Sequence, residues 1–240
     1  MDIILYILIG AVILLFIAGL AIANFSDGQL LSQYNLLLNE IASINLTALD
    51  FCRLVSNNLF GGRISVGIDN KVFGGVYYPG KNHINISKDI AFSGSVSALT
   101  ICAHELGHAM QFRDNREKIL KHYKFSRIIK FLGLLVFPLF ISSIMFIVFD
   151  NFFLGIILAG VALIFFILAL SLKIFTVNIE KEASTNALKI LKDFDVLHEE
   201  HTKMATSLLN YAKQTYVADF FRALLCWTFL TRKTKIFSWG

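Results

Sequence analysis

The chain has 240 residues, of which 56% are apolar and 16% charged. Soluble domains average about 45–50% apolar and about 25% charged residues, so the composition argues against an ordinary cytosolic enzyme. The net charge is +5, but the basic residues flank apolar runs instead of covering a soluble face, which argues against a nucleic-acid binder. The 3 cysteines are widely spaced and form no CxxC pair, which excludes a disulfide framework and a thiolate zinc site.

Three apolar runs predict transmembrane helices, at residues 3–23, 131–149 and 152–172. About 20 such residues cross the hydrocarbon core of a bilayer. The first run lacks the basic flank of a cleaved signal peptide, so we expect an uncleaved anchor. Only Asp150 and Asn151 separate the other two runs, which predicts a helical hairpin, and Pro138 is expected to kink its first helix.

The basic residues predict the orientation in the membrane. Lys and Arg gather at 113–130 and 173–192 and are absent from the hairpin tip and from the first 24 residues. Because basic loops stay cytoplasmic, residues 24–130 and 173–240 are expected on the cytoplasmic side of the cell membrane, in contact with anionic lipid. Residues 217–231 are apolar, but Asp219 and Arg222 interrupt them, so we favour core packing or an interfacial helix.

The polar segments change period along the chain. Residues 28–59 predict one amphipathic helix or two in series, ended by Gly61 and Gly62. Apolar residues alternate over 63–87 between turn signals, which predicts a small antiparallel sheet of two or three strands. Ser93 or Ser95 can cap a helix that runs from about Val96 into the basic stretch, and 179–215 is again helical in pattern.

We therefore expect a mainly α membrane protein with a small α+β catalytic region. The predicted parts are an N-terminal anchor (1–24), a cytoplasmic region with helix, sheet and HExxH helix (25–130), the hairpin (131–173), and a C-terminal helical region (174–240).

The motif His104-Glu105-Leu106-Gly107-His108 carries the chemistry. Histidines four residues apart share one helix face and can bind one zinc ion, while the glutamate can act as general base on water. HExxH also occurs by chance on exposed helices. Here the flanking residues are apolar, and polar groups in such a helix need partners, which a metal supplies. Gly107 lacks a side chain between the histidines, so another element can pack closely there.

A third zinc ligand must come from elsewhere, because the longer HExxHxxGxxH pattern is absent. Two carboxylates follow the third apolar run, at Glu180 and Glu182. On a helix, Glu180 shares a face with Ala183 and Ala187, and the small alanines would allow close packing against the HExxH helix. Glu182 points toward lysines and solvent. The pattern favours Glu180 over Glu182 without excluding the latter.

These residues resemble the neutral zinc metallopeptidases of bacterial membranes, the YugP-like family. The order matches: an N-terminal span, strands ending near residues 84–87, AHELGHAMQ at 103–111, a pair of spans, Glu-x-x-Ala-Ser at 180–184, and a C-terminal segment at 215–218. The resemblance implies a gluzincin-type site with His104, His108 and Glu180 on one Zn²⁺ and Glu105 as base.

The chain also departs from these relatives. The more distant HtpX-like membrane proteases carry Asp where Ser184 stands, and a carboxylate there could orient a zinc-bound histidine. Gly74-Gly75 and Tyr77-Tyr78 replace a His-Tyr-Asp-Pro-like stretch.

The expected function is an integral membrane zinc metalloprotease that hydrolyses protein substrates at the cytoplasmic membrane face. The alternative is a non-catalytic membrane scaffold or adaptor with a structural or vestigial metal site. The sequence does not choose an oxyanion-stabilising residue among His198, His201, Tyr211 and Tyr216. The charged run that holds His198 and His201 is interpreted as a solvated helix face rather than a second metal site.

Overall fold

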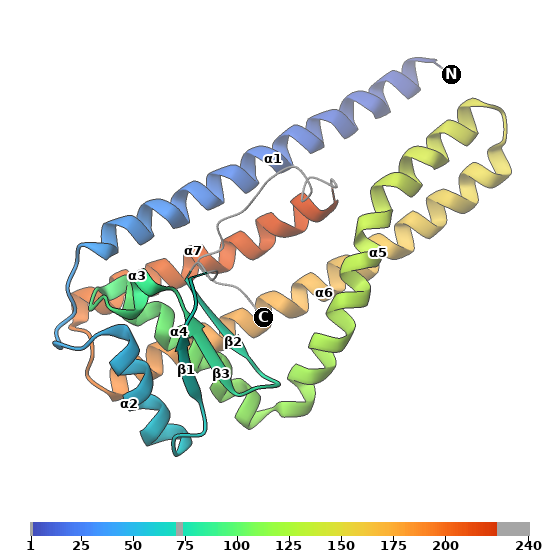
Figure 1. The fold of residues 1–240 in the computed structure, drawn as a ribbon. Helices are drawn as coiled ribbons and strands as arrows, with labels where there is room; N and C mark the ends of the chain where they lie inside the picture. The colour runs from blue at the N-terminus through green and yellow to red at the C-terminus, as the bar shows by residue number, and fades with distance from the viewer. Residues whose placement is uncertain (1, 71–73, 225–240) are drawn as a thin grey trace. The chain divides into compact units, whose positions relative to one another are not determined.

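The computed structural model describes residues 2–70 and 74–224, and the chain divides into two compact units. Of the described residues, one unit holds 2–27, 121–177 and 214–224, and the other holds 28–70, 74–120 and 178–213. Helices α1, α5, α6 and α7 each run from one unit into the other (Figure 1). The HExxH motif at residues 104–108 lies in the second unit.

Two helices open this unit. The long helix α1 (Asp2–Leu38) ends here, and α2 (Ala48–Phe60) follows after a break, so the amphipathic stretch at 28–59 is two helices. The Thr47 hydroxyl accepts a hydrogen bond from the Asp50 amide at the start of α2. At its other end Gly61 adopts a left-handed conformation with φ of 60° and donates to the Ser56 carbonyl. The predicted stop at Gly61 is confirmed.

The sheet has three short strands: β1 (Ser65–Ile68), β2 (Gly75–Tyr78) and β3 (His83–Ile86). Their positions agree with the alternating pattern, but the expectation of an antiparallel sheet is wrong. The order is β1-β3-β2, with β2 antiparallel and β1 parallel to β3. A tight turn after Tyr78 joins β2 to β3, whereas β1 pairs with the other edge of β3. An alternating pattern of apolar residues does not indicate whether a strand pairs parallel or antiparallel to its neighbour.

The core of the unit surrounds α4 (Val96–Asp114), which follows the short helix α3 (Lys88–Ala91). Ser95 caps α4, its hydroxyl accepting from the Ala98 amide. Every residue from Val96 to Phe112 is buried. The helix begins at Val96 as predicted and reaches only the start of the basic stretch, at Arg113. It ends at Asn115, which leaves helical geometry and donates to the Gln111 carbonyl, and asparagine competes poorly for helix interiors.

The other unit contains the predicted hairpin. Helix α5 (Arg116–Val148) continues through Pro138, Asp150 and Asn151 form the turn, and α6 (Phe152–Asp193) follows. Both helices are long and apolar enough to cross a membrane. In the most apolar segment of each helix, only 17% of the residues of α5 and 11% of those of α6 are buried. Two of the three predicted spans therefore have the required length and composition among the described residues.

Two further predictions concern apolar stretches near the two ends of the chain. Residues 3–23 lie within the 37-residue helix α1, whose role as an anchor stays a prediction. Helix α7 (Glu199–Leu224) contains the beginning of the apolar stretch at 217–231, and the rest of that stretch lies outside the described residues.

Helices α4 and α6 approach each other closely in the unit that holds the HExxH motif. A Cβ atom on Gly107 would clash with the main-chain carbonyl oxygen of Ala183 and lie 3.2 Å from the Ala187 nitrogen. Ala183 and Ala187 are themselves fully buried. The prediction that Gly107 and the two alanines allow close packing is confirmed.

We expect Gly107→Ala to lower the midpoint of thermal unfolding, because the added methyl meets main-chain atoms that cannot rotate away. Overpacking of this kind costs about 1–3 kcal/mol. Unfolding of the purified protein in detergent would measure it. Gly28→Ala is the matched control: its new Cβ has nothing within 4 Å, and alanine favours helix over glycine by about 0.5–1 kcal/mol. Equal midpoints for the two variants would contradict the close contact.

Candidate metal centre

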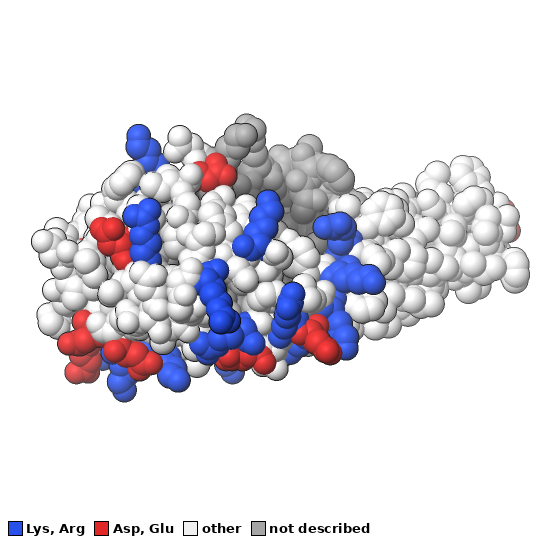
Figure 2. Space-filling model, turned by 60° about the horizontal axis from the view of Figure 1, so that its bottom comes forward, with Lys and Arg blue, Asp and Glu red and all other residues white. Residues whose placement is uncertain are grey.

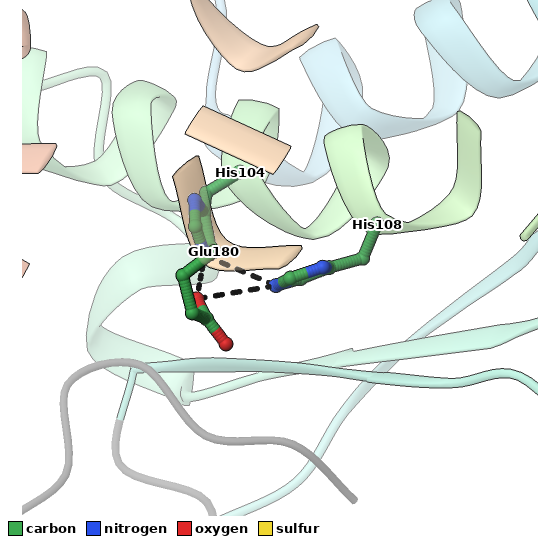
Figure 3. A group of neighbouring side chains, drawn as sticks. All are labelled: His104, His108 and Glu180. Carbon is green, nitrogen blue, oxygen red and sulfur yellow. Dashed lines mark hydrogen bonds and ion pairs between the residues drawn. The ribbon is translucent and has the colours of Figure 1, made fainter. Parts of the chain in front are cut away.

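Two helices bring three potential metal ligands together. His104 and His108 lie on successive turns of α4, and Glu180 faces them from α6 (Figure 3). The two Nε2 atoms are 3.1 Å apart, and Glu180 Oε2 lies 3.3 Å from that of His104 and 3.7 Å from that of His108. All three side chains are buried, with 1–3% of their surface exposed. The preference for Glu180 over Glu182 therefore agrees with the structure.

The donor set fits a zinc ion. Ligand atoms held about 2.0–2.1 Å from a tetrahedral zinc lie about 3.3 Å from one another, and the three observed separations scatter around this value. Among the described residues, no further His, Cys, Asp or Glu joins this group. Three protein ligands leave one tetrahedral position open, as in catalytic rather than structural zinc sites.

Glu105 lies beside this group and is 1% exposed. Its carboxylate oxygens make no hydrogen bond of standard geometry, although the Tyr77 main-chain amide favours its charged form. Strand β2 passes so close that a Cβ on Gly75 would come within 2.8 Å of Glu105 Cγ. A side chain at position 75 would therefore have to displace the Glu105 side chain.

The comparisons with known proteins agree with this geometry. The family model described as "Putative neutral zinc metallopeptidase" matches residues 11–232, which is most of the chain. The chain belongs to this family. A curated relative, the "Putative membrane protease YugP" of Bacillus subtilis (strain 168), is 24% identical over 143 residues. That match covers 59% of this chain and 60% of the relative's length. No solved structure matches the chain significantly.

Burial controls the electrostatics of this candidate site. It lowers the pKa of His104 to about 3 and that of His108 to about 4, although Glu180 and a hydrogen bond to Gln111 oppose the shift at His108. Neutral imidazoles are the form that binds metal. Burial, reinforced by the negative charge of Glu180, raises the pKa of Glu105 well above its usual value. A raised carboxyl pKa brings a general base closer to neutral pH.

One polar residue of the site was missed by the sequence reasoning. Gln111 is 1% exposed, its Oε1 lies 2.9 Å from His108 Nδ1, and its Nε2 donates to the Ile179 carbonyl at 2.7 Å. The signal was its position three residues after His108, on the same helix face and within an apolar run.

Two other residues with metal-binding side chains lie near the three ligands in the sequence, but each has a different partner. Glu182 is 39% exposed and pairs with Lys118 Nζ at 3.3 Å. Cys102 is fully buried, and a hydrogen bond with Cys52 together with burial raises the pKa of its thiol, so it packs in the core and does not act as a ligand of this group.

The four oxyanion candidates have different surroundings. His198 is exposed, and its main-chain amide donates to Ser43 Oγ, while His201 is half-buried. Neither histidine belongs to a potential metal group among the described residues, which agrees with a solvated helix face. Tyr211 is partly buried against the core of the unit that holds the HExxH motif, and Tyr216 belongs to the other unit. An oxyanion role for any of the four stays a prediction.

We expect Glu105→Gln to stabilise the metal-free protein at neutral and alkaline pH. Because folding raises the pKa of Glu105, its contribution is favourable below the unfolded value of 4.5 and is lost as pH rises through the folded pKa. Glutamine stays neutral at every pH, so its burial adds no free-energy cost for a charged group. His104 and His108 titrate in both proteins, so their effects cancel in the comparison.

Thermal unfolding with a chelator between pH 4.5 and 8 would measure this difference. The gain in midpoint from Glu105→Gln should grow with pH and shrink toward pH 4.5. A variant less stable than wild type across this range would contradict the burial of an unpaired carboxyl group.

Proposed function

We propose that this protein is a membrane-integral, zinc-dependent endopeptidase in which His104, His108 and Glu180 bind the metal. The observation that supports this most directly is the convergence of Glu180 on the HExxH pair, with all three side chains buried. Membership of a zinc metallopeptidase family supports peptide bonds as the target and proteins as substrates.

A zinc ion in this site would supply a Lewis acid and lower the pKa of a coordinated water toward about 7. Glu105 is the general base and acid. Its carboxylate accepts a proton when water attacks the peptide carbonyl, and it returns a proton to the leaving amine nitrogen. Burial matters for both steps, because it excludes bulk water and raises the pKa of the carboxyl group.

The alternative, a scaffold with a structural metal, has less support. A structural zinc site closes all four positions with protein ligands, whereas three ligands converge among the described residues. A scaffold also has no use for Glu105, because a buried carboxyl group without a hydrogen bond of standard geometry destabilises the fold.

Strand β2 gives the site an edge on which an extended substrate can pair. It is the last strand of the sheet, and the Ser87 amide donates to the Gly74 carbonyl. In an antiparallel pair the bonding direction alternates, so the main-chain groups of Gly75 and Tyr77 point away from β3, on the side where Tyr77 reaches Glu105. Because the Tyr77 amide already faces Glu105, we infer that a substrate pairs with the Gly75 amide and carbonyl and with the Tyr77 carbonyl. N-methylation of a substrate main-chain amide removes one hydrogen-bond donor. At the position that pairs with β2 it should raise KM about 2- to 10-fold, and at other positions it should leave KM unchanged.

The hairpin supports a membrane location. Its apolar side chains are exposed, among them Phe153 at 79% and Ile156 at 66%, which water would disfavour. Figure 2 shows the hairpin end almost free of Lys and Arg, which lie elsewhere on the visible face. Helix α6 continues without a break beyond Leu172 to Glu180. Eight residues of helix rise about 12 Å, so we place the site near the cytoplasmic membrane surface, with protein segments there as substrates.

The first test compares metal content and proteolysis in four variants. His104→Ala and Glu180→Ala should lose zinc and activity, because each removes a ligand. Glu105→Gln should keep about one zinc per chain and lose about 10²- to 10⁴-fold in kcat, because it removes the proton carrier alone. Zinc analysis and cleavage of an unfolded protein substrate would be measured on the same detergent-purified samples.

Glu182→Ala is the matched control. It removes a carboxylate two residues from Glu180 that pairs with Lys118 at the surface, so zinc and activity should stay at the wild-type level. Zinc retained in Glu180→Ala, or full activity in Glu105→Gln, would contradict the proposal.

A further inference from the structure

The Gln111 amide connects the two helices that carry the metal ligands. It lies one turn after His108 on α4, with its oxygen 2.9 Å from His108 Nδ1, and its nitrogen donates across to the main chain of α6 at Ile179, 2.7 Å away. Ile179 directly precedes Glu180. One side chain therefore contacts one ligand and the residue next to another.

The orientation of this amide follows from its partners. The Ile179 carbonyl can only accept a hydrogen bond, so the NH₂ group of Gln111 must face it. The amide oxygen then faces His108 Nδ1, which must carry the proton. Neutral imidazole has a single proton, so Nε2 of His108 keeps its lone pair, and this is the atom that faces Glu180 and His104.

We propose that Gln111 is a positioning residue that fixes the metal-binding tautomer of His108 and holds the Glu180 segment of α6 against it. This rests on the zinc site proposed above. Partners of metal-binding histidines typically raise metal affinity 10–100-fold. In other sites a carboxylate or a main-chain carbonyl fills this role. Here it is a neutral side-chain amide that also connects the two ligand-bearing helices, while Ser184 stands where a carboxylate could have acted.

Asn186 provides a matched control. Its Nδ2 donates from α6 to the Gly107 carbonyl of α4 at 3.3 Å, so it also connects the two helices, yet this hydrogen bond goes to a main-chain carbonyl and not to a ligand side chain. Gln111→Met and Asn186→Leu each replace an amide by an apolar side chain of similar shape. A merely structural role for Gln111 predicts similar effects of the two substitutions.

The test measures zinc affinity of the full-length protein in detergent by competition with a chelator. Gln111→Met should weaken zinc binding 10–100-fold, and Asn186→Leu should change it less than threefold. Equal losses in both variants, or none in Gln111→Met, would overturn the role of Gln111. Absence of zinc from the wild type would instead overturn the proposed function.

A measurement on the wild type keeps the test independent of how the variants fold. In the cobalt-substituted protein, nuclear magnetic resonance shows the ring N–H protons of ligand histidines as strongly shifted signals. His108 should give an Nδ1–H signal that exchanges slowly with solvent, because Gln111 and burial protect it. Coordination through Nδ1, with the proton on Nε2, would overturn the inference.

Discussion

The site depends on how closely α6 approaches α4. Glu180 can lie 3.3 Å from His104 only because Gly107 presents no side chain to α6 and because α6 presents Ala183 and Ala187 in return. Residue 107 stands between the two histidines of the motif, so the point of closest contact and the point of chemistry coincide. The helical period places His104 and His108 on one face of α4, and it places Glu180, Ala183 and Ala187 on one face of α6.

The surroundings of the site combine an apolar core with a few polar groups that have defined partners. Helix α4 is buried along nearly its whole length. Polar side chains buried there without partners would destabilise the fold, and this helix buries His104, Glu105, His108 and Gln111. Gln111 has two hydrogen bonds, and the histidines lie against Glu180. Glu105 alone makes no hydrogen bond of standard geometry at its carboxylate oxygens. Such a buried carboxyl group lowers the stability of the fold at the position where the proposed mechanism needs a proton carrier.

Much of this could be predicted from the sequence, because helical spacing and residue size are local properties. The HExxH face, the small residues at 107, 183 and 187, the Ser95 cap and the hairpin turn all follow from patterns within a few residues. The pairing of β1 with β3 could not be predicted, since an alternating strand is compatible with either neighbour in either direction. Nor could Gln111, whose role depends on a carbonyl 68 residues further along the chain.

The central claim is that His104, His108 and Glu180 hold one zinc ion with a fourth position open. X-ray absorption at the zinc edge of the purified protein tests it most directly. We predict nitrogen and oxygen neighbours at about 2.0–2.1 Å, with the scattering signature of two imidazoles and no sulfur. A sulfur neighbour at about 2.3 Å, or a zinc without imidazole neighbours, would contradict the account.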